Sequence, residues 1–362
     1  MSDLVRAALA AVVDGRTLSM DDARDAMGSV MDGEATSAQL AGLLVALRMR
    51  GETVEELAGF VAAMRARVVP VAAPPDIVDT CGTGGDRSGT FNISTTAALV
   101  VAAAGVPVAK HGNRAVTSRS GSADMLDALG VRTDHDADSA AEALRTDGFA
   151  FLFAPGFHPA MKHAGPTRRE IGVRTAFNLL GPLTNPAGAR RQVVGVADPL
   201  VAPRVAEVLR LLGVERALVV HGDGLDELPL DGSGVMYDVM GDEVVRREVR
   251  ASDLGLTAAG TVDLAGGTAQ ENARLCRAVL AGERGPRRDV VLLNAAAALL
   301  AAGRVTHLRD GIEIAARAID SGAATALLTR LQAGRATHES TLAATAPGAA
   351  PGAASPAGPG PA

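Results

Sequence analysis

Apolar residues recur at helical spacing through the first 68 residues. Leu4 to Val12 and Leu40 to Leu47 carry them three or four positions apart, as on one face of a helix. Ser19 is followed by two aspartates and Thr53 by two glutamates, which is typical of acidic first turns at helix starts. No strand pattern interrupts this stretch. The sequence therefore predicts a small helical domain over residues 1–68.

The pattern changes after a Pro-rich boundary at residues 69–75. Short apolar runs now alternate with helix-like runs such as Ser94–Ala104 and the region around Leu126–Leu129. This alternation is typical of an α/β sheet. The predicted strands are Ile77–Asp79, Val106–Ala109, Phe149–Phe153, Gln192–Val196 and Ala217–Val220.

Residues 158–188 break the alternation with two short predicted helices and the sequence GPLTNP. We expect this segment to pack on the helical domain, which leaves residues 76–157 and 189–345 as the α/β domain. Residues 346–362 contain only Ala, Pro, Gly and Ser. Such a segment cannot bury a core, so we expect it to be disordered.

Composition narrows the class of protein. Apolar residues make up 48% of the chain and charged residues 21%, an ordinary balance for a globular protein. The net charge of −6 argues against general nucleic-acid binding, which favours a basic face. The two cysteines, Cys81 and Cys276, form no disulfide framework or zinc pattern. No apolar run reaches the roughly 20 residues of a membrane span, and we expect a cytoplasmic protein without membrane or nucleic-acid partners.

The stretch Asp79–Thr96, DTCGTGGDRSGTFNISTT, suggests a phosphate cradle. Three glycines follow a predicted strand and allow close approach of the backbone to a ligand. Asn92 and Ser94 then open a helix, whose N-terminal N–H groups favour anions. The loop lacks the Walker A pattern, and Arg87 replaces the third glycine of a dinucleotide fingerprint. A tight turn that only caps the helix is the alternative.

A basic loop follows at residues 110–122, KHGNRAVTSRSGS. Its Lys and Arg side chains can offset phosphate charge, while its hydroxyl groups fix orientation. The alternative is a solvated surface loop.

An acidic pair, Asp226–Glu227, comes directly after a predicted strand. Neighbouring carboxylates suit Mg²⁺, which is often held between carboxylates and substrate phosphates. An exposed acidic turn is the alternative for such a pair in isolation.

Together these elements resemble the anthranilate phosphoribosyltransferase family. The resemblance extends from about residue 79 to 227, with the motifs in the family's order. The matching stretches are Cys81–Asp86, Asn92–Thr95, Lys110–Arg114, Ser118–Asp124, His158–Pro159, Arg168–Glu170, Arg174, Phe177–Asn178, Gly181–Pro186 and Asp226–Glu227. Val116 and Thr117 stand where the family often has Ala and Ser.

The resemblance implies a small helical domain joined by a hinge to a larger α/β domain with a mainly parallel central sheet, of the nucleoside phosphorylase and phosphoribosyltransferase type. It also implies a homodimer. Phosphoribosyl pyrophosphate is expected at Gly82, Gly85, Asp86, Thr90, Asn92, Ile93, Ser94, Thr95, Lys110, His111, Gly112, Asn113, Arg114, Ala115, Val116, Thr117, Ser118 and Ser122. Mg²⁺, as two ions, is expected at Ser94, Asp226 and Glu227, and anthranilate at Gly82, Asn113, His158 and Arg168.

The implied reaction is transfer of the 5-phosphoribosyl group to the amine of anthranilate, which releases pyrophosphate in the second step of tryptophan biosynthesis from chorismate. The amine is already nucleophilic, so no general base is assigned, although His111 is a candidate. Two rivals are a pyrimidine nucleoside phosphorylase-like enzyme and a non-catalytic relative that binds nucleotides or nucleic acid.

Overall fold

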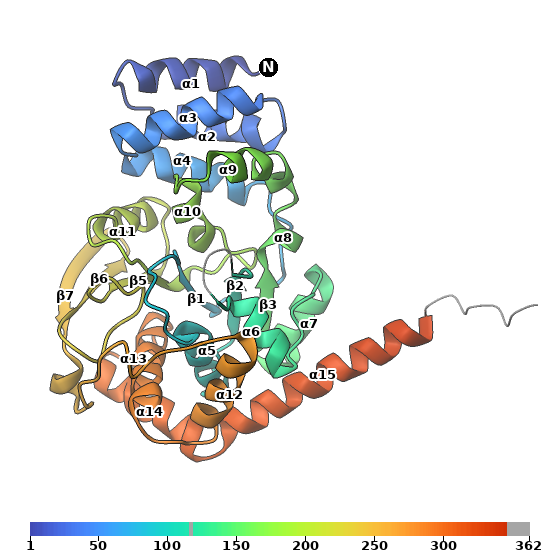
Figure 1. Ribbon diagram of the computed structural model, residues 1–362, viewed down its shortest axis with the longest axis vertical. Helices are drawn as coiled ribbons and strands as arrows, with labels where there is room; N and C mark the ends of the chain where they lie inside the picture. The colour runs from blue at the N-terminus through green and yellow to red at the C-terminus, as the bar shows by residue number, and fades with distance from the viewer. Residues whose placement is uncertain (116–118, 346–362) are drawn as a thin grey trace, which may run out of the picture.

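The computed structural model describes residues 1–115 and 119–345. Within that part of the chain, a bundle of helices stands at one end of a larger body built around a twisted sheet (Figure 1). The fold class predicted from the sequence is confirmed. The predicted disordered tail, residues 346–362, lies outside the described residues, as do Val116, Thr117 and Ser118.

The bundle consists of the first four helices, α1 (Asp3–Val13), α2 (Met20–Met31), α3 (Ser37–Arg50) and α4 (Val54–Arg65). Both predicted helix starts are confirmed by their caps. The Ser19 hydroxyl accepts a hydrogen bond from the Asp22 N–H, and the Thr53 hydroxyl accepts one from the Glu56 N–H at 3.2 Å. Such caps satisfy N–H groups that have no partner inside the helix.

The sheet has seven strands among the described residues, in the order β3-β2-β1-β4-β5-β6-β7. The first five in sequence are parallel, and the last two form an antiparallel edge. The bounds are β1 (Val78–Gly82), β2 (Val108–Gly112), β3 (Phe149–Phe153), β4 (Arg191–Gly195), β5 (Arg216–His221), β6 (Gly234–Met240) and β7 (Glu243–Val249).

The predicted strands need correction at three places. The strand predicted at Ile77–Asp79 lies at Val78–Gly82, so Gly82 of the predicted glycine loop ends a strand. The strand predicted at Val106–Ala109 lies at Val108–Gly112, since Pro107 has no N–H for a strand ladder. Its carbonyl instead accepts a hydrogen bond from the Val78 N–H at 2.9 Å. The hairpin of β6 and β7 was not predicted at all. The strand at Phe149–Phe153 is confirmed at both ends.

Side chains on the parallel strands point alternately to two apolar layers. Phe149 and Phe151 enter the core beneath α5, whereas Ala150 and Leu152 pack on the opposite side. A parallel sheet covered on both faces requires this double apolar pattern.

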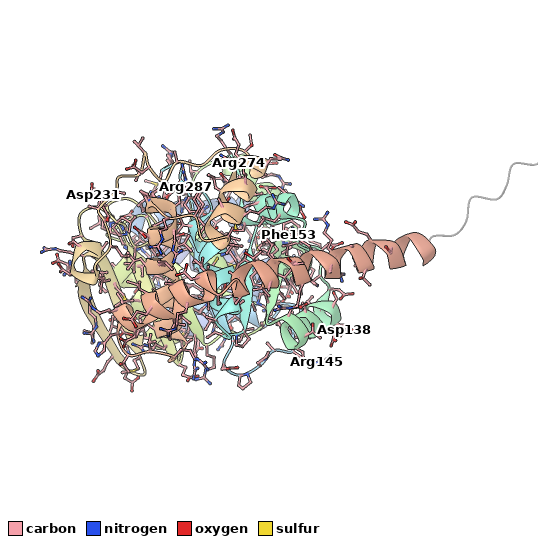
Figure 2. All side chains as sticks on the ribbon, turned by 90° about the horizontal axis from the view of Figure 1, so that it is seen from below. Asp138, Arg145, Phe153, Asp231, Arg274 and Arg287 are labelled. Carbon is pink, nitrogen blue, oxygen red and sulfur yellow. The ribbon has the colours of Figure 1, made fainter. Side chains whose placement is uncertain are left out.

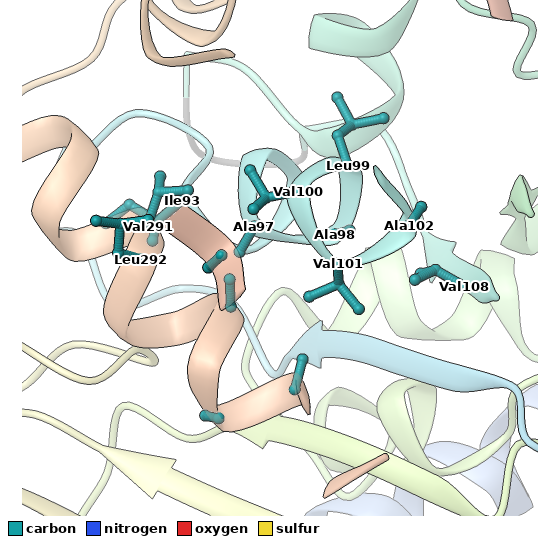
Figure 3. Packing of buried hydrophobic residues seen from close by; sticks show 14 of the residues in the cluster. Ile93, Ala97, Ala98, Leu99, Val100, Val101, Ala102, Val108, Val291 and Leu292 are labelled. Atoms are coloured by element: carbon teal, nitrogen blue, oxygen red, sulfur yellow. The ribbon is translucent and has the colours of Figure 1, made fainter. Parts of the chain in front are cut away.

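Helices cover both faces of the sheet. The larger layer holds α5 (Ile93–Ala103), α6 (Ser122–Leu129), α12 (Ala269–Leu280), α13 (Pro286–Ala301), α14 (Leu308–Asp320) and α15 (Ala323–Thr345). Figure 3 shows its centre, where Ala97 and Val101 of α5 lie near α13 and small side chains permit close helix packing. The other face carries α7 (Ala137–Asp147) and α11 (Ala202–Leu211). Among the described residues, no helix has both the length and the apolar character that crossing a membrane requires.

The segment after β3 returns the chain to the bundle. It contains α8 (Ala154–Phe157), α9 (Gly165–Ile171), α10 (Phe177–Leu180) and two 3₁₀ turns, Pro159–Lys162 and Gly181–Leu183. A third 3₁₀ turn, Ala251–Leu254, follows β7. Helix α9 contacts α3, and α10 contacts α4. The chain therefore passes between the bundle and the sheet three times, and these passages border the site described next.

Candidate active site

The candidate site lies where the strand order of the sheet reverses. β1 has β2 on one side and β4 on the other, so the loops after these strands diverge at their carboxyl ends. Such switch points are the usual ligand sites of open α/β sheets. A cleft of about 610 Å³ opens here between the sheet and the α8–α10 segment. The predicted site residues that line it are Gly82, Ser94, Lys110, His111, Gly112, Asn113, Ser122, His158 and Arg168.

The acidic pair lies against the glycine loop. Asp226 accepts a hydrogen bond from the Gly84 N–H at 2.9 Å, and Glu227 accepts one from the Ser94 N–H at 2.9 Å. The two carboxylates are thereby turned toward different partners, and they border a small pocket that also contains Gly82 and Ser94.

Two glycines on neighbouring strands create the space for this pair. Gly82 of β1 is directly opposite Gly195 of β4. A Cβ on Gly82 would lie 2.3 Å from the Asp226 carboxylate, and one on Gly195 would lie 1.7 Å from the Asp226 carbonyl oxygen. Any larger residue at either position would displace the acidic loop. Gly195 was not among the predicted site residues.

Burial and mutual repulsion disfavour the ionised forms of the acidic pair. Removal from water raises the pKa of Asp226, and the nearby Asp86 charge raises it further. Burial also raises the pKa of Glu227, as does the charge of Asp226, while Lys110 opposes the shift. The described residues contain no group of three or more His, Cys, Asp or Glu side chains placed to hold a metal. Two carboxylates that lack a full counter-charge nevertheless fit Mg²⁺ that takes its other ligands from a hydroxyl, water and substrate phosphate.

The rest of the glycine loop is stabilised locally. Asp86 accepts hydrogen bonds from the Ser88 N–H at 3.2 Å and the Ser88 hydroxyl at 2.7 Å, and Thr90 lies 3.0 Å from that hydroxyl. Arg174 donates to the Gly84 carbonyl at 3.1 Å and the Thr83 carbonyl at 3.4 Å. Arg174 thus connects the segment between α9 and α10 to the loop, while Gly85 leaves space for its guanidinium.

At the start of α5, the side chains of Ile93 and Thr95 are buried. The Ile93 N–H donates to the Phe91 carbonyl at 2.8 Å, and the Ser94 N–H is the one bonded to Glu227. Asn92 donates to the Ser120 carbonyl at 3.3 Å and accepts from the Asn272 amide at 2.8 Å. Asn272 of α12 was not predicted, because nothing in its local sequence marks it.

Lys110 is buried beneath the cleft instead of reaching into solvent. Its ammonium donates a hydrogen bond to the Thr80 carbonyl. Burial raises the pKa of the neighbouring Asp79 to about 6, and the Lys110 charge opposes that rise. Lys110 therefore offsets negative charge beneath the site, including that of Glu227.

Two histidines meet on the bundle side of the cleft. The His111 Nδ1–H donates to the Gly181 carbonyl at 3.1 Å, and the Nε2 atoms of His111 and His158 are 3.2 Å apart. Burial lowers the pKa of His111 to about 3 and that of His158 to about 4. Both rings are therefore neutral near pH 7.

Arg168 is the cationic residue of the cleft best placed to bind the carboxylate of a planar aromatic acid. Its Cζ atom lies 4.8 Å from the centroid of the Phe177 ring, a cation–π distance. Arg169 and Lys162 also line the cleft, and Lys162 was not predicted. This side of the cleft thus combines positive charge with flat apolar surface.

Eight of the described residues predicted to bind phosphoribosyl pyrophosphate do not line the cleft: Gly85, Asp86, Thr90, Asn92, Ile93, Thr95, Arg114 and Ala115. The last two bond elsewhere. The Arg114 guanidinium pairs with Asp124 at 3.0 Å and Asp127 at 2.7 Å, and Ala115 donates its N–H to Asp124 at 2.9 Å.

The fold and the cleft define a transferase of the two-domain glycosyl transferase type. The helical bundle domain of the glycosyl transferase family matches residues 6–68, and the a/b domain of that family matches residues 74–325. The anthranilate phosphoribosyltransferase of Moorella thermoacetica is 55% identical over 332 residues, which cover 91% of this chain and 98% of that protein. The chain belongs to the anthranilate phosphoribosyltransferase family.

Solved structures agree with this assignment. The anthranilate phosphoribosyltransferase of Thermus thermophilus is 46% identical with a TM-score of 0.86, over 91% of this chain and 99% of that one. The enzyme of Saccharomyces cerevisiae in complex with phosphoribosyl pyrophosphate and Mg is 27% identical with a TM-score of 0.85, over 93% and 99% of the two chains.

Proposed function

We propose that the cleft transfers the 5-phosphoribosyl group of phosphoribosyl pyrophosphate to the amine of anthranilate. The products are N-(5-phosphoribosyl)anthranilate and pyrophosphate, in the tryptophan pathway. One observation supports this above all: the cleft joins a glycine loop with paired carboxylates to a wall that contains Arg168, Phe177 and His158. The first part suits a metal-bound pyrophosphate, and the second suits a planar aromatic carboxylate.

The phosphoribosyl pyrophosphate side is formed by the glycine loop, the start of α5 and the loop after β2. Gly82, Ser94, Asn113 and Ser122 face the cleft from three separate segments. The positive end of the α5 helix dipole offers partial positive charge to a phosphate. As pyrophosphate leaves, this fixed dipole stabilises the negative charge that develops on it.

Mg²⁺ would be held by Asp226, Glu227 and the Ser94 hydroxyl, and two ions fit the divergent directions of the two carboxylates. When bound, the metal supplies charge neutralisation of the leaving group. The yeast relative in complex with phosphoribosyl pyrophosphate and Mg supports the choice of metal.

Anthranilate would enter from the bundle side. Arg168 would hold its carboxylate, and Asn113, His158 and the Gly82 backbone would place its ring and amine near ribose C1. Orientation of a neutral, nucleophilic amine supplies much of the rate enhancement without a strong base. His111 Nε2 is unprotonated at neutral pH but faces His158. His111 therefore shapes the pocket in our proposal, and a His111→Ala variant should retain most of its kcat.

The rivals fit the site less well. A nucleoside phosphorylase uses inorganic phosphate and has no need of the Asp226–Glu227 pair, and a non-catalytic relative would be expected to lose it. The family assignment also favours the transferase. Incubation with thymidine and phosphate should release no thymine.

The protein is proposed to act as a cytoplasmic homodimer. Val45 and Met49 are exposed apolar residues one turn apart on the same face of α3. An apolar face of this kind favours burial in an interface. Sedimentation velocity should give a dimer, and Met49→Glu should shift it toward monomer.

The deciding experiment follows anthranilate fluorescence over time with purified protein and phosphoribosyl pyrophosphate. Decay that requires both the pyrophosphate and Mg²⁺, and that EDTA abolishes, is the expected result. Folded protein that leaves the fluorescence unchanged under all conditions would contradict the proposed function.

A further inference from the structure

The loop between β2 and α6 is closed at its base by a single carboxylate. Asp124, in the first turn of α6, accepts hydrogen bonds from the Ala115 N–H and the Gly121 N–H, both at 2.9 Å. These two residues lie on opposite sides of the loop. One carboxylate oxygen therefore joins the chain that leaves the sheet to the chain that enters the helix.

The two sides of the loop also touch directly. A Cβ on Gly121 would lie 2.4 Å from the Ala115 nitrogen and 2.6 Å from the Arg114 carbonyl carbon. The Ala123 N–H donates to the Asn113 carbonyl at 3.3 Å. We define residues 113–115 together with 121–124 as the loop neck. Only glycine at position 121 permits this approach.

A second layer of charge holds Asp124 in place. Its other oxygen accepts from Arg114 at 3.0 Å, and Arg114 also reaches Asp127 at 2.7 Å. Asp127 accepts from the Thr133 hydroxyl at 2.6 Å. Partial burial opposes ionisation of Asp124, yet the Ala115 and Gly121 N–H groups together with Arg114 keep its pKa below the usual value.

The neck carries two residues of the cleft lining, Asn113 on one side and Ser122 on the other. We propose that Asp124 is a positioning residue, which fixes the distance between Asn113 and Ser122 and so preorganises the phosphoribosyl pyrophosphate side of the cleft. Arg114 acts on the substrate only through Asp124. This inference rests on the proposed function, because it assigns the neck to one of the two substrates.

The assignment predicts a specific kinetic pattern. If the hydrogen bonds of the loop neck are lost, Asn113 and Ser122 contact phosphoribosyl pyrophosphate more weakly. The side of the cleft that contains Arg168 and Phe177 is not changed. Asp124→Ala should therefore raise KM for phosphoribosyl pyrophosphate at least about tenfold, the effect of losing charge-assisted hydrogen bonds. KM for anthranilate should rise by a clearly smaller factor, because Asn113 also borders anthranilate but Arg168 keeps its position. A merely structural role would lower stability without separating the two substrates.

Three further variants separate the parts of the neck. Asp124→Asn keeps an oxygen that can accept from both N–H groups but loses the pair with Arg114, so it should match Arg114→Gln and restore most of the affinity. Gly121→Ala changes no charge and should reproduce Asp124→Ala, because its methyl group forces the neck open. Asp138→Ala, an exposed acid on α7, is the matched control and should leave both KM values unchanged (Figure 2).

Each variant is to be assayed for both substrates and titrated calorimetrically with phosphoribosyl pyrophosphate and Mg²⁺ in the absence of anthranilate. Circular dichroism and thermal unfolding verify that it is folded. Weaker binding in Asp124→Ala and Gly121→Ala, with recovery in Asp124→Asn, supports the proposal. Equal changes in both KM values, or unchanged binding in folded Asp124→Ala, would overturn it. A wild type that binds the pyrophosphate without consuming anthranilate would overturn the proposed function alone, whereas a wild type that does not bind it would overturn both.

Discussion

The Cζ atom of the Arg168 guanidinium lies 4.8 Å from the centroid of the Phe177 ring. Burial lowers the pKa of Arg168, although the group stays charged at any physiological pH. A cation held against an aromatic ring, with part of its hydration removed, is prepared to pair with a carboxylate. This relationship underlies the assignment of the anthranilate side.

Arg168→Ala should raise KM for anthranilate by at least about tenfold, the usual worth of a charge-assisted pair, with little change in KM for phosphoribosyl pyrophosphate. Arg169→Ala serves as the comparison, because Arg169 lines the same cleft but is exposed. Steady-state kinetics with each substrate varied provide the measurement. Equal effects on both substrates in Arg168→Ala would refute the assignment.

Removal of either metal-binding carboxylate should weaken the response to Mg²⁺. Asp226→Asn and Glu227→Gln are expected to raise the Mg²⁺ concentration for half-maximal rate about tenfold or more, because each deletes a charged oxygen ligand. Asp223→Asn is the control. Asp223 is exposed in the same loop and has φ of 44°, a conformation that Asn also tolerates. A normal Mg²⁺ titration in both variants would exclude this pair as the metal site.

Gly195→Ala tests the paired glycines. Its methyl group would meet the Asp226 carbonyl oxygen at 1.7 Å, so the acidic loop must move. We expect a loss of about 1–3 kcal/mol in the free energy of unfolding, as for other overpacked sites, and a weaker response to Mg²⁺. Gly260→Ala, with no atom near its Cβ position, should change neither. Urea denaturation and the Mg²⁺ titration measure the two effects. If Gly195→Ala has the stability and the Mg²⁺ response of the wild type, the space left by the two glycines is not required.

Arg174→Ala should loosen the glycine loop. Arg174 is exposed and bonds two carbonyls of the loop, Thr83 and Gly84, so the loss is modest, about 1 kcal/mol or fivefold in KM for phosphoribosyl pyrophosphate. Arg174→Lys offers one ammonium in place of the two-pronged guanidinium and should recover only part of the loss. A change confined to KM for anthranilate would instead place Arg174 on the aromatic side.

Three buried histidines should each lower the free energy of unfolding in mild acid. Burial lowers the pKa of His111 to about 3 and the pKa values of His158 and His135 to about 4, whereas an unfolded histidine titrates near 6.5. Below pH 6.5 the unfolded chain therefore takes up protons that the folded chain does not. The stability that these neutral histidines contribute is therefore fully present above pH 6.5. It falls as the pH drops toward 4, by up to about 1.4 kcal/mol per pH unit for each histidine.

Asp79 acts in the opposite direction. Its pKa is raised by burial to about 6, so the folded chain gains a proton there before the unfolded chain does. Burial also raises the pKa values of Asp226 and Glu227, so three carboxyl groups oppose the three histidines. The histidines are therefore tested by comparing two proteins: in urea denaturation between pH 7 and 4.5, the free energy of unfolding of His111→Gln should fall less, or rise more, with acid than that of the wild type. Parallel pH profiles of the two proteins would contradict a neutral, buried His111.

The sequence predicted the parts of the site whose residue types carry chemistry. The glycine loop, the hydroxyls at the start of α5 and the carboxylates of Asp226 and Glu227 are visible as short motifs. Their meeting across more than a hundred residues of chain was inferred from the family resemblance, since no local pattern encodes strand order. Lys110 shows the limit of reading charge alone, because a lysine in a basic loop proves to be buried beneath the cleft.

Residues whose role depends on how distant segments pack together could not be predicted from the sequence. Gly195 matters because β1 and β4 pair in one register, which sets it opposite Gly82. Asn272 matters because α12 packs beside the start of α5 and lets its amide reach Asn92. The strand β7 was missed for a different reason. As an edge strand it is largely polar and exposed, EVVRREV, and has little apolar alternation to reveal it.

The three passages of the chain between bundle and sheet restrict how this enzyme can be rebuilt. A bundle joined by one linker could be exchanged between relatives as a cassette, or removed to leave an independent domain. Here α9 and α10 reach the bundle from within the α/β sequence, and they bring Arg168 and Phe177 with them. A chimaera that replaces residues 1–65 alone would therefore combine the helical bundle of one parent with the α8–α10 segment of the other, which carries the proposed anthranilate contacts. Acceptor specificity should follow the α8–α10 segment, and only a graft of both pieces together preserves their packing.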